Sequence, residues 1–144
     1  MKRKTKKFNG FGFPVVLVDV PVRTEFGDEI LDVDFNVLGE RVFQALLVKP
    51  SRLAGAETKF LRQTLDMTQE EFARILKVER SLISKWERQD LKATGMSFHI
   101  EVFLRLKFGK LRGLDIGREL AVIEPGAAAK GVGKPLELRM SRAG

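Results

Sequence analysis

The side chains best suited to chemistry in this sequence are hydrogen-bond donors that recur between residues 80 and 88. At helical spacing they fall on or near one surface, and they are Arg80, Ser81, Ser84, Lys85 and Arg88. Guanidinium, ammonium and hydroxyl groups donate hydrogen bonds to phosphate oxygens, and a guanidinium can hold O6 and N7 of guanine together. This donor set therefore predicts a surface that binds a polyanion.

Two short helices joined by a tight turn are needed to hold these donors in place. Thr68 and Glu71 fit a capping box, in which each side chain bonds the other's backbone N–H, so a helix is predicted to begin at Thr68. In the next helix Ile83 and Trp86 recur three apart and point inward, which leaves the donors on the opposite surface. The inward positions of the first helix are Phe72, Ala73, Ile75 and Leu76.

Taken together, these positions resemble the Cro/CI-type (lambda-repressor-like, XRE) family of helix-turn-helix DNA-binding proteins. The family shows a Thr/Ser-Gln opening, an Ala in the first helix and an Ile-Ser-x-Trp-Glu close. Here those features are residues 68–69 (TQ), Ala73 and residues 83–87 (ISKWE). The resemblance covers residues 53–108 and implies a five-helix fold that places its recognition helix in the DNA major groove.

The resemblance also implies roles for single residues. The positions that face base edges in the family are here Arg80, Ser81 and Lys85. Gln69 occupies the position that usually grips phosphate at the start of the preceding helix, where the helix N-terminus helps to bind an anion. Ser84 and Arg88 are candidates for contacts with the DNA backbone, which position the helix and do not select sequence.

Two positions depart from the family pattern. Lys77 stands where the family commonly has a helix-ending Gly, and a lysine in the left-handed conformation costs about 1 kcal/mol relative to glycine. Glu79 stands where a Ser or Thr commonly caps the recognition helix. Its carboxylate complements the positive helix N-terminus but repels phosphate, so tight DNA binding must overcome it.

Composition agrees with a polyanionic partner and excludes several classes of protein. The 144 residues carry a net charge of +7 and are 44% hydrophobic, as expected for a globular protein that binds nucleic acid, with an anionic membrane surface as the competing partner. The absence of cysteine rules out disulfides, thiolate metal sites and a cysteine nucleophile. Since no apolar run is long enough to span a bilayer, we expect a cytoplasmic protein without membrane contact.

The predicted fold class is α+β, mainly α. Residues 1–12 form a basic arm predicted to be disordered, and residues 13–50 a small β-containing unit. In that unit Phe13–Val22 is predicted to be a strand, and Pro21 indicates either a sheet edge or the end of the strand. Gly27-Asp28 is predicted to form a turn before a second strand over 29–33 and a helix capped by Asp34.

Residues 51–115 complete the expected five-helix domain. Residues 98–108 alternate like a strand yet also fit a helix, and the resemblance favours the helix, with its core stripe at Ile100, Phe103, Leu104, Phe108 and Leu111. A second apolar stripe is a candidate homodimer interface, with cover by the C-terminal residues as the alternative. Its members are Phe98, Val102 and Leu106.

The C-terminal part, residues 116–144, is predicted to contain a flexible linker and then a short strand. The linker is the Gly- and Ala-rich stretch 124–135, and the strand alternates apolar residues from 136 to 140. The N-terminal strands are the candidate neighbours of this strand.

The overall layout resembles MqsA-like antitoxins of type II toxin–antitoxin modules. The similarity rests on a β-containing unit ahead of the Cro/CI-type domain and on a loose match at residues 20–22 and 26–32 (VPV…FGDEILD). It implies a protein toxin held by the N-terminal unit and an operator bound by the helical domain. Some members carry a zinc site of paired cysteines, which this cysteine-free chain lacks. The alternatives are a stand-alone regulator and an RNA-binding adaptor.

An enzyme is not expected, and neither is a cofactor. His99 is the single histidine and lies in an apolar segment, where a structural or surface role is more common than general-base catalysis. Asp32 and Asp34 could form a carboxylate pair, but Asp34 has a simpler role as a helix cap. Residues 10–12 (GFG) are too short for a phosphate-binding loop.

Overall fold

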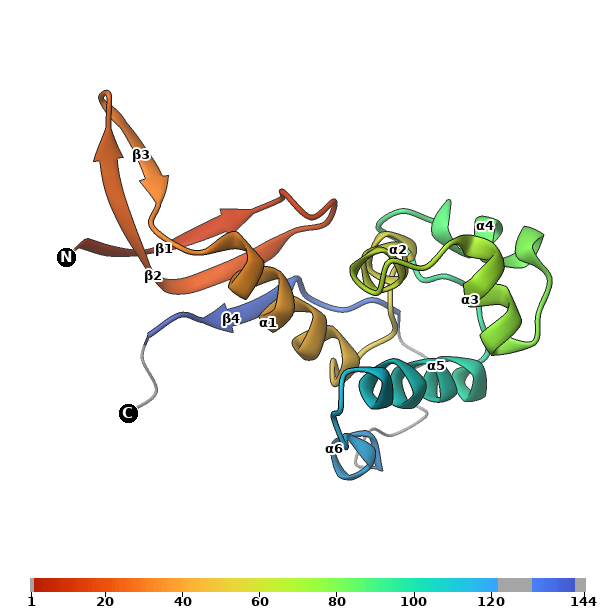
Figure 1. Ribbon diagram of the computed structural model, residues 1–144. Coiled ribbons are helices and arrows are strands. Elements are labelled where there is room, and N and C mark those ends of the chain that lie inside the picture. Colours follow the sequence, from red (N-terminus) through yellow and green to blue (C-terminus); the bar gives the residue numbers. More distant parts are fainter. Residues whose placement is uncertain (1, 122–130, 142–144) are drawn as a thin grey trace.

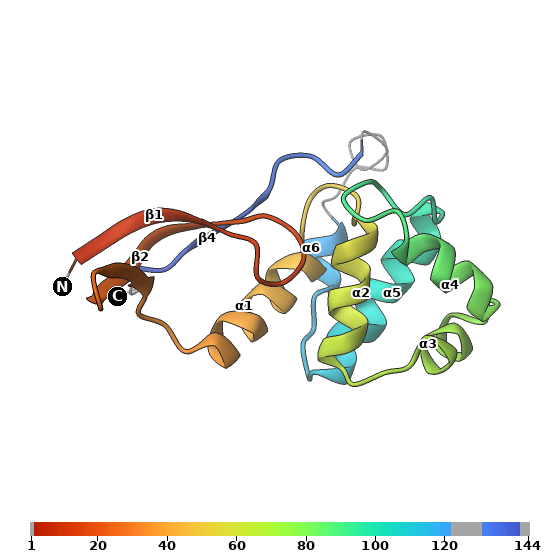
Figure 2. The same cartoon turned by 90° about the horizontal axis from the view of Figure 1, so that it is seen from above.

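The computed structural model describes residues 2–121 and 131–141. Within them the chain is α+β, as expected, with six helices and a four-stranded mixed sheet. The sheet lies at one end of the molecule and helices α2 to α5 gather at the other, with α1 between them (Figures 1 and 2). A continuous apolar core runs through both ends.

Strand β2 (Val15–Glu25) is the centre of the sheet. Strand β1 (Lys2–Phe8) pairs antiparallel along one side of it. The other side is shared by β3 (Asp28–Leu31), which is antiparallel near the end of β2, and by β4 (Leu136–Arg139), which is parallel near its start. The short C-terminal strand therefore does join the N-terminal strands.

Two N-terminal expectations were wrong. Residues 2–8 are an ordered strand and not a disordered arm, because backbone pairing to β2 and ion pairs to Glu29 offset the repulsion among their like charges. The strand over 14–22 is not an edge, since β1 and β4 flank it on both sides. Pro21 is accommodated because neither β3 nor β4, the neighbours on one side of β2, pairs with it. Its carbonyl bonds the Asp32 N–H at 2.8 Å, and its missing N–H, on the same side, falls between the β2 residues that pair with β4 (15–18) and those that pair with β3 (22–25).

A bulge in β2 keeps its apolar side chains on one face. Asp19 has a positive φ of 59°, and the pairing with β1 steps from Lys4–Val20 to Lys6–Leu17, which leaves one extra residue in β2. A bulge of this kind resets the alternation of a strand. As a result the buried side chains on both sides of the bulge share a face, and they are Val15, Leu17, Val20 and Val22.

The β2–β3 hairpin turns one residue earlier than expected. Its two central residues are Phe26 and Gly27, whose φ angles of 52° and 84° are those of a type I′ turn, while Asp28 already begins β3. The hairpin projects away from the helices (Figure 1).

Helix α1 (Phe35–Leu47) joins the sheet to the helical part. It begins as predicted, because the Asp34 carboxylate accepts hydrogen bonds from the backbone N–H groups of Asn36 and Val37. Its apolar face is fully buried and lies in the same core as β2 and α5. The buried residues are Leu38, Val42, Phe43, Leu46 and Leu47.

Five helices follow, of which four lie within residues 51–115, where a five-helix domain was expected, and the last lies beyond them. They are α2 (Gly55–Thr64), α3 (Gln69–Leu76), α4 (Arg80–Glu87), α5 (Phe98–Leu111) and α6 (Gly117–Ala121). Residues 98–108 are helical, and a strand there is excluded. The short helix α6 lies where only linker and strand were expected, because Ile116 and Leu120 pack into the core. Much of the predicted linker, residues 122–130, lies outside the described residues.

The buried face of α5 differs from the expected stripe. Phe103 and Leu111 are both 48% exposed, whereas Glu101 and Arg105 are buried. The two charges tolerate burial because they pair with each other at 3.0 Å, and Glu101 also accepts a hydrogen bond from Arg52. A pattern of hydrophobic residues does not reveal a buried ion pair. The stripe predicted from that pattern therefore included Phe103 and Leu111, which lie on the surface side of the helix.

Candidate nucleic-acid interface

Helix α4 is separated from α3 by only three residues. The Thr68–Glu71 capping box is present at the start of α3, and hydrogen bonds to Thr68 lower the pKa of Glu71. The helix ends at Lys77, which takes the left-handed conformation at φ 57°. The N–H of the next residue, Val78, then donates to the carbonyl of Ala73 at 3.0 Å, which closes the turn.

The inner face of α4 packs closely against the other helices. Ile83 and Trp86 are buried, as predicted. Gly55, the first residue of α2, permits the close approach, because a Cβ atom there would lie 2.4 Å from the Trp86 carbonyl oxygen. Packing against the other helices thus fixes the position and tilt of α4.

A buried ion pair anchors the end of α4. The Glu87 carboxylate accepts hydrogen bonds from Nε and Nη2 of Arg62 on α2, at 2.7 and 3.0 Å. Gln69 on α3 donates its side-chain N–H to the same carboxylate at 3.0 Å, and Arg62 also donates to the Met67 carbonyl. Glu87 therefore ties three helices together in a desolvated setting.

This anchor was missed by sequence reasoning. Glu87 was noted only as part of the ISKWE close, and Arg62 was not singled out. The sequence did contain a signal for it: Glu87 directly follows the inward-facing Trp86, so its side chain lies on the inward half of α4.

The outer face of α4 carries most of the predicted donors. Arg80, Ser81, Lys85 and Arg88 are exposed. Ser84 is half-buried, and its hydroxyl accepts a hydrogen bond from Arg88 at 2.9 Å. Since the one carboxylate of α4, Glu87, is buried against Arg62, the exposed charges of the helix are all positive.

Two of the predicted positions have a different setting from the rest. Gln69 is half-buried, and its hydrogen bond to Glu87 directs it toward α4 as well as toward the surface. Glu79 is the N-cap of α4 but its side chain makes no capping hydrogen bond, so its carboxylate stays exposed beside Arg80 in the sequence.

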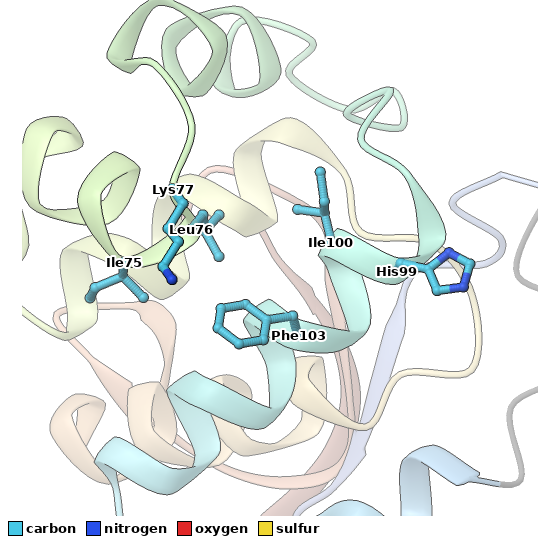
Figure 3. Close-up of a pocket in the computed structure, with 6 residues that line it drawn as sticks. All are labelled: Ile75, Leu76, Lys77, His99, Ile100 and Phe103. Carbon is cyan, nitrogen blue, oxygen red and sulfur yellow. The ribbon is translucent and has the colours of Figure 1, made fainter.

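An apolar groove of about 320 Å³ lies between the end of α3 and α5. Ile75, Leu76, Ile100 and Phe103 line it, together with the side chain of Lys77 (Figure 3). His99 lies at its margin and points away from the other labelled residues in Figure 3. Nothing in this arrangement pairs the histidine with a nucleophile.

The predicted dimer residues on α5 are exposed to different degrees. Phe98 and Val102 are half-buried within the chain, whereas Leu106 is 40% exposed. The exposed apolar surface of α5 also includes Phe103 and Leu111, which sequence analysis had assigned to the core.

The described part of the chain contains neither a candidate metal cluster nor a candidate membrane span. No group of three or more histidine and carboxylate side chains in residues 2–121 and 131–141 could hold a metal ion. Over the same ranges no helix has the length and apolar character needed to cross a membrane.

Comparison with known proteins gives no family assignment. No family model, no curated protein and no solved structure matches the chain. The likeness to the Cro/CI-type family therefore rests on the residues of this sequence and on the arrangement described above.

Proposed function

We propose that this protein is a sequence-specific DNA-binding transcriptional regulator that uses α3 and α4 as a helix-turn-helix. The observation that carries the proposal is the contrast between the two faces of α4. One face is fixed by Trp86 and by the Arg62–Glu87 pair, and the charged side chains that the helix exposes on the other, Arg80 and Lys85, are both positive, with the exposed Glu79 directly before them. A rigid, cationic helix of this kind fits the DNA major groove.

Individual roles follow from position along α4. Arg80 is the first residue of the helix, and Lys85 lies one turn beyond Ser81, so both can reach base edges when the N-terminal part of the helix enters the groove. Ser81 lies beside Arg80 and is a second donor to bases. Arg88 and Ser84, already joined by a hydrogen bond, are placed for phosphate contact near the helix end.

Binding as a homodimer completes the proposal. A single short helix reads few base pairs, and helix-turn-helix proteins gain specificity by presenting two such helices to half-sites about one DNA turn apart. The exposed apolar residues of α5, chiefly Phe103 and Leu106, are the surface we assign to the dimer.

An antitoxin that represses its own operon is a narrower version of the same proposal. It would add a protein toxin as partner of the N-terminal unit, while a stand-alone regulator would have none. An RNA-binding adaptor is the main alternative to both, because phosphate contacts are common to DNA and RNA.

Selection of bound duplexes from a random DNA pool tests the proposal. We expect the full chain to enrich a two-fold symmetric motif, and we expect duplex DNA to outcompete single-stranded RNA at fixed salt. Enrichment of no motif, or preferential binding of the RNA, would reject it. The same experiment with Lys59→Ala, an exposed cation of α2, controls for nonspecific loss of positive charge.

A further inference from the structure

A groove lies on the sheet, in a part of the chain far from α4. The groove, of about 710 Å³, is bounded by strands β1, β2 and β3 and by the segment that enters α1. Its lining includes Lys6, Phe8, Glu29, Leu31, Val33 and Phe35. It is larger than the groove between α3 and α5.

Lys6 lines this groove, and Lys4 lies next to it on the same strand and shares the groove's Glu29, so the positive charge here exceeds the negative charge of that one carboxylate. Lys4 and Lys6 point to the same face of β1, and their side chains cross β2 to reach the single carboxylate of Glu29 on β3. The Nζ atoms lie 2.7 and 2.6 Å from its two oxygens, and Lys2 approaches it at 3.9 Å. The carboxylate of one glutamate is thus shared by the ammonium groups of three lysines.

The lysines still have capacity for another anion. The side chains of Lys4 and Lys6 are 39% and 38% exposed, so each ammonium group has donors that do not point at Glu29. Competition between the two ammonium groups for one carboxylate leaves a net positive site, and the strong hold on Glu29 lowers its pKa to about 2.

The other wall is apolar and partly uncovered. The rings of Phe8 and Phe35 lie 5.7 Å apart, and Phe35 is 49% exposed although it opens α1. Val33 and Leu31 continue this wall and are only partly buried. Exposed aromatic surface of this kind next to a hollow is typical of a binding site and not of a solvated face.

We propose that this groove binds an acidic protein segment, with a carboxylate placed between Lys4 and Lys6 and an apolar side chain placed against Phe8 and Phe35. Charge complementarity selects the acidic group, and the apolar wall requires a hydrophobic neighbour within the same segment. The inference goes beyond DNA binding and does not depend on α4.

A protein segment fits the groove better than a nucleic-acid backbone does. Phosphates would satisfy the lysines but would leave the apolar wall formed by Val33, Leu31 and Phe35 uncovered. The outer edge of β1 pairs with no other strand in the described part of the chain, so an extended segment can also hydrogen-bond along it.

The test uses the full chain and a short synthetic peptide in which glutamate and leucine alternate. We expect the peptide to shift the backbone NMR signals of Phe8, Leu31 and Val33 while those of α4 stay unchanged. Replacing every glutamate of the peptide by lysine should abolish the shifts, and replacing every leucine by serine should weaken them. A single-stranded oligodeoxynucleotide that shifts the same signals more strongly than the peptide overturns the proposal.

Protein variants then separate the two walls of the groove. Lys6→Gln and Phe35→Ala should each weaken peptide binding by about fivefold or more, in keeping with loss of an ion pair or of an aromatic contact. The matched controls are Lys59→Gln and Val37→Ala, an exposed lysine and an exposed α1 residue outside the groove, which should change binding less than twofold.

The outcomes distinguish this inference from the proposed function. Circular dichroism establishes that each variant is folded, and duplex binding by the same variants reports on α4 separately. Equal losses for groove and control variants, or no peptide-induced shift in the wild type, reject the groove as the binding site whatever the DNA result.

Discussion

The guanidinium of Arg62 and the carboxylate of Glu87 form a buried, two-point ion pair that joins α2 to the end of α4. Glu87→Ala should lower the free energy of unfolding by about 3–5 kcal/mol, because it leaves the guanidinium buried without its counter-charge. Denaturant titration measures this. Glu70→Ala, on the exposed side of α3, is the matched control and should change stability by no more than about 0.5 kcal/mol.

A double variant separates loss of the pair from loss of the contact area. Arg62→Met combined with Glu87→Leu should recover much of the stability lost in Glu87→Ala, since apolar groups of similar size replace a desolvated pair at little cost. A double variant as unstable as Glu87→Ala would show that the hydrogen bonds to Met67 and Gln69 matter more than the charge pairing.

Arg80→Ala should cost about 1–3 kcal/mol on the selected duplex and relax the preference at one base pair, because the guanidinium of Arg80 is assigned to a base edge. Gln69→Ala should instead weaken all sequences to a similar degree, since a phosphate contact carries no base information. Selection from a random pool followed by titration distinguishes the two. An unchanged motif for Arg80→Ala would remove that residue from the base-reading set.

Leu106→Glu should give a folded monomer that binds a full two-fold operator poorly. A charge on the exposed apolar surface of α5 opposes burial against a second copy, and Leu106 is 40% exposed, whereas Val102 is half-buried and a charge there also endangers the chain's own core. Light scattering and circular dichroism measure the outcome. Leu91→Glu, with the native residue 52% exposed in a loop, is the control, and a dimeric Leu106→Glu would move the interface elsewhere.

Lys77→Gly should stabilise the protein by about 1 kcal/mol, because Lys77 ends α3 with a φ of 57° and glycine adopts that conformation without the Cβ penalty. Thermal and denaturant unfolding both report it. At Lys92, which does not have a positive φ, the same substitution should destabilise the protein by adding freedom to the unfolded chain. A gain at both sites would mean that removal of positive charge, and not backbone strain, is responsible.

Acid should weaken the sheet through Glu29. The two lysine hydrogen bonds hold the pKa of Glu29 at about 2, below its ordinary value of 4.5, so its stabilising effect is complete above pH 4.5 and is lost as the pH falls toward 2. Unfolding measured across this window should show a shallower pH dependence for Glu29→Gln than for the wild type. Glu137→Gln, an exposed glutamate on β4, should retain the wild-type slope.

Local sequence rules predicted the starts of α1 and α3 and the strands β2, β3 and β4, but neither strand β1 nor the central place of β2 in the sheet. Caps at Asp34 and Thr68 placed the starts of α1 and α3 because each depends on a few adjacent residues. The ordering of residues 2–8 depends instead on distant partners, namely β2 and Glu29, and a run of lysines considered alone indicates disorder.

The candidate site shows the same division. The outward donors of α4 could be predicted from helical spacing, and most of them are exposed as expected. The charged residues that are buried could not be predicted, because in the sequence a Glu101–Arg105 or Arg62–Glu87 pair looks like ordinary surface charge. The bulge at Asp19 was also hidden, since the Val-rich stretch around it alternates without showing where the extra residue falls.

The pairing of β4 with β2 sets an order of events during synthesis. Residues 15–18 emerge from the ribosome long before residues 136–139, so one side of β2 is without its parallel partner while the whole helical part is being translated. During that interval an unpaired, Val-rich strand side is exposed to other nascent chains, which makes it the point where misassembly is expected to begin. Slow translation or delayed release after α6 would therefore lower the yield of native protein without altering any contact in it.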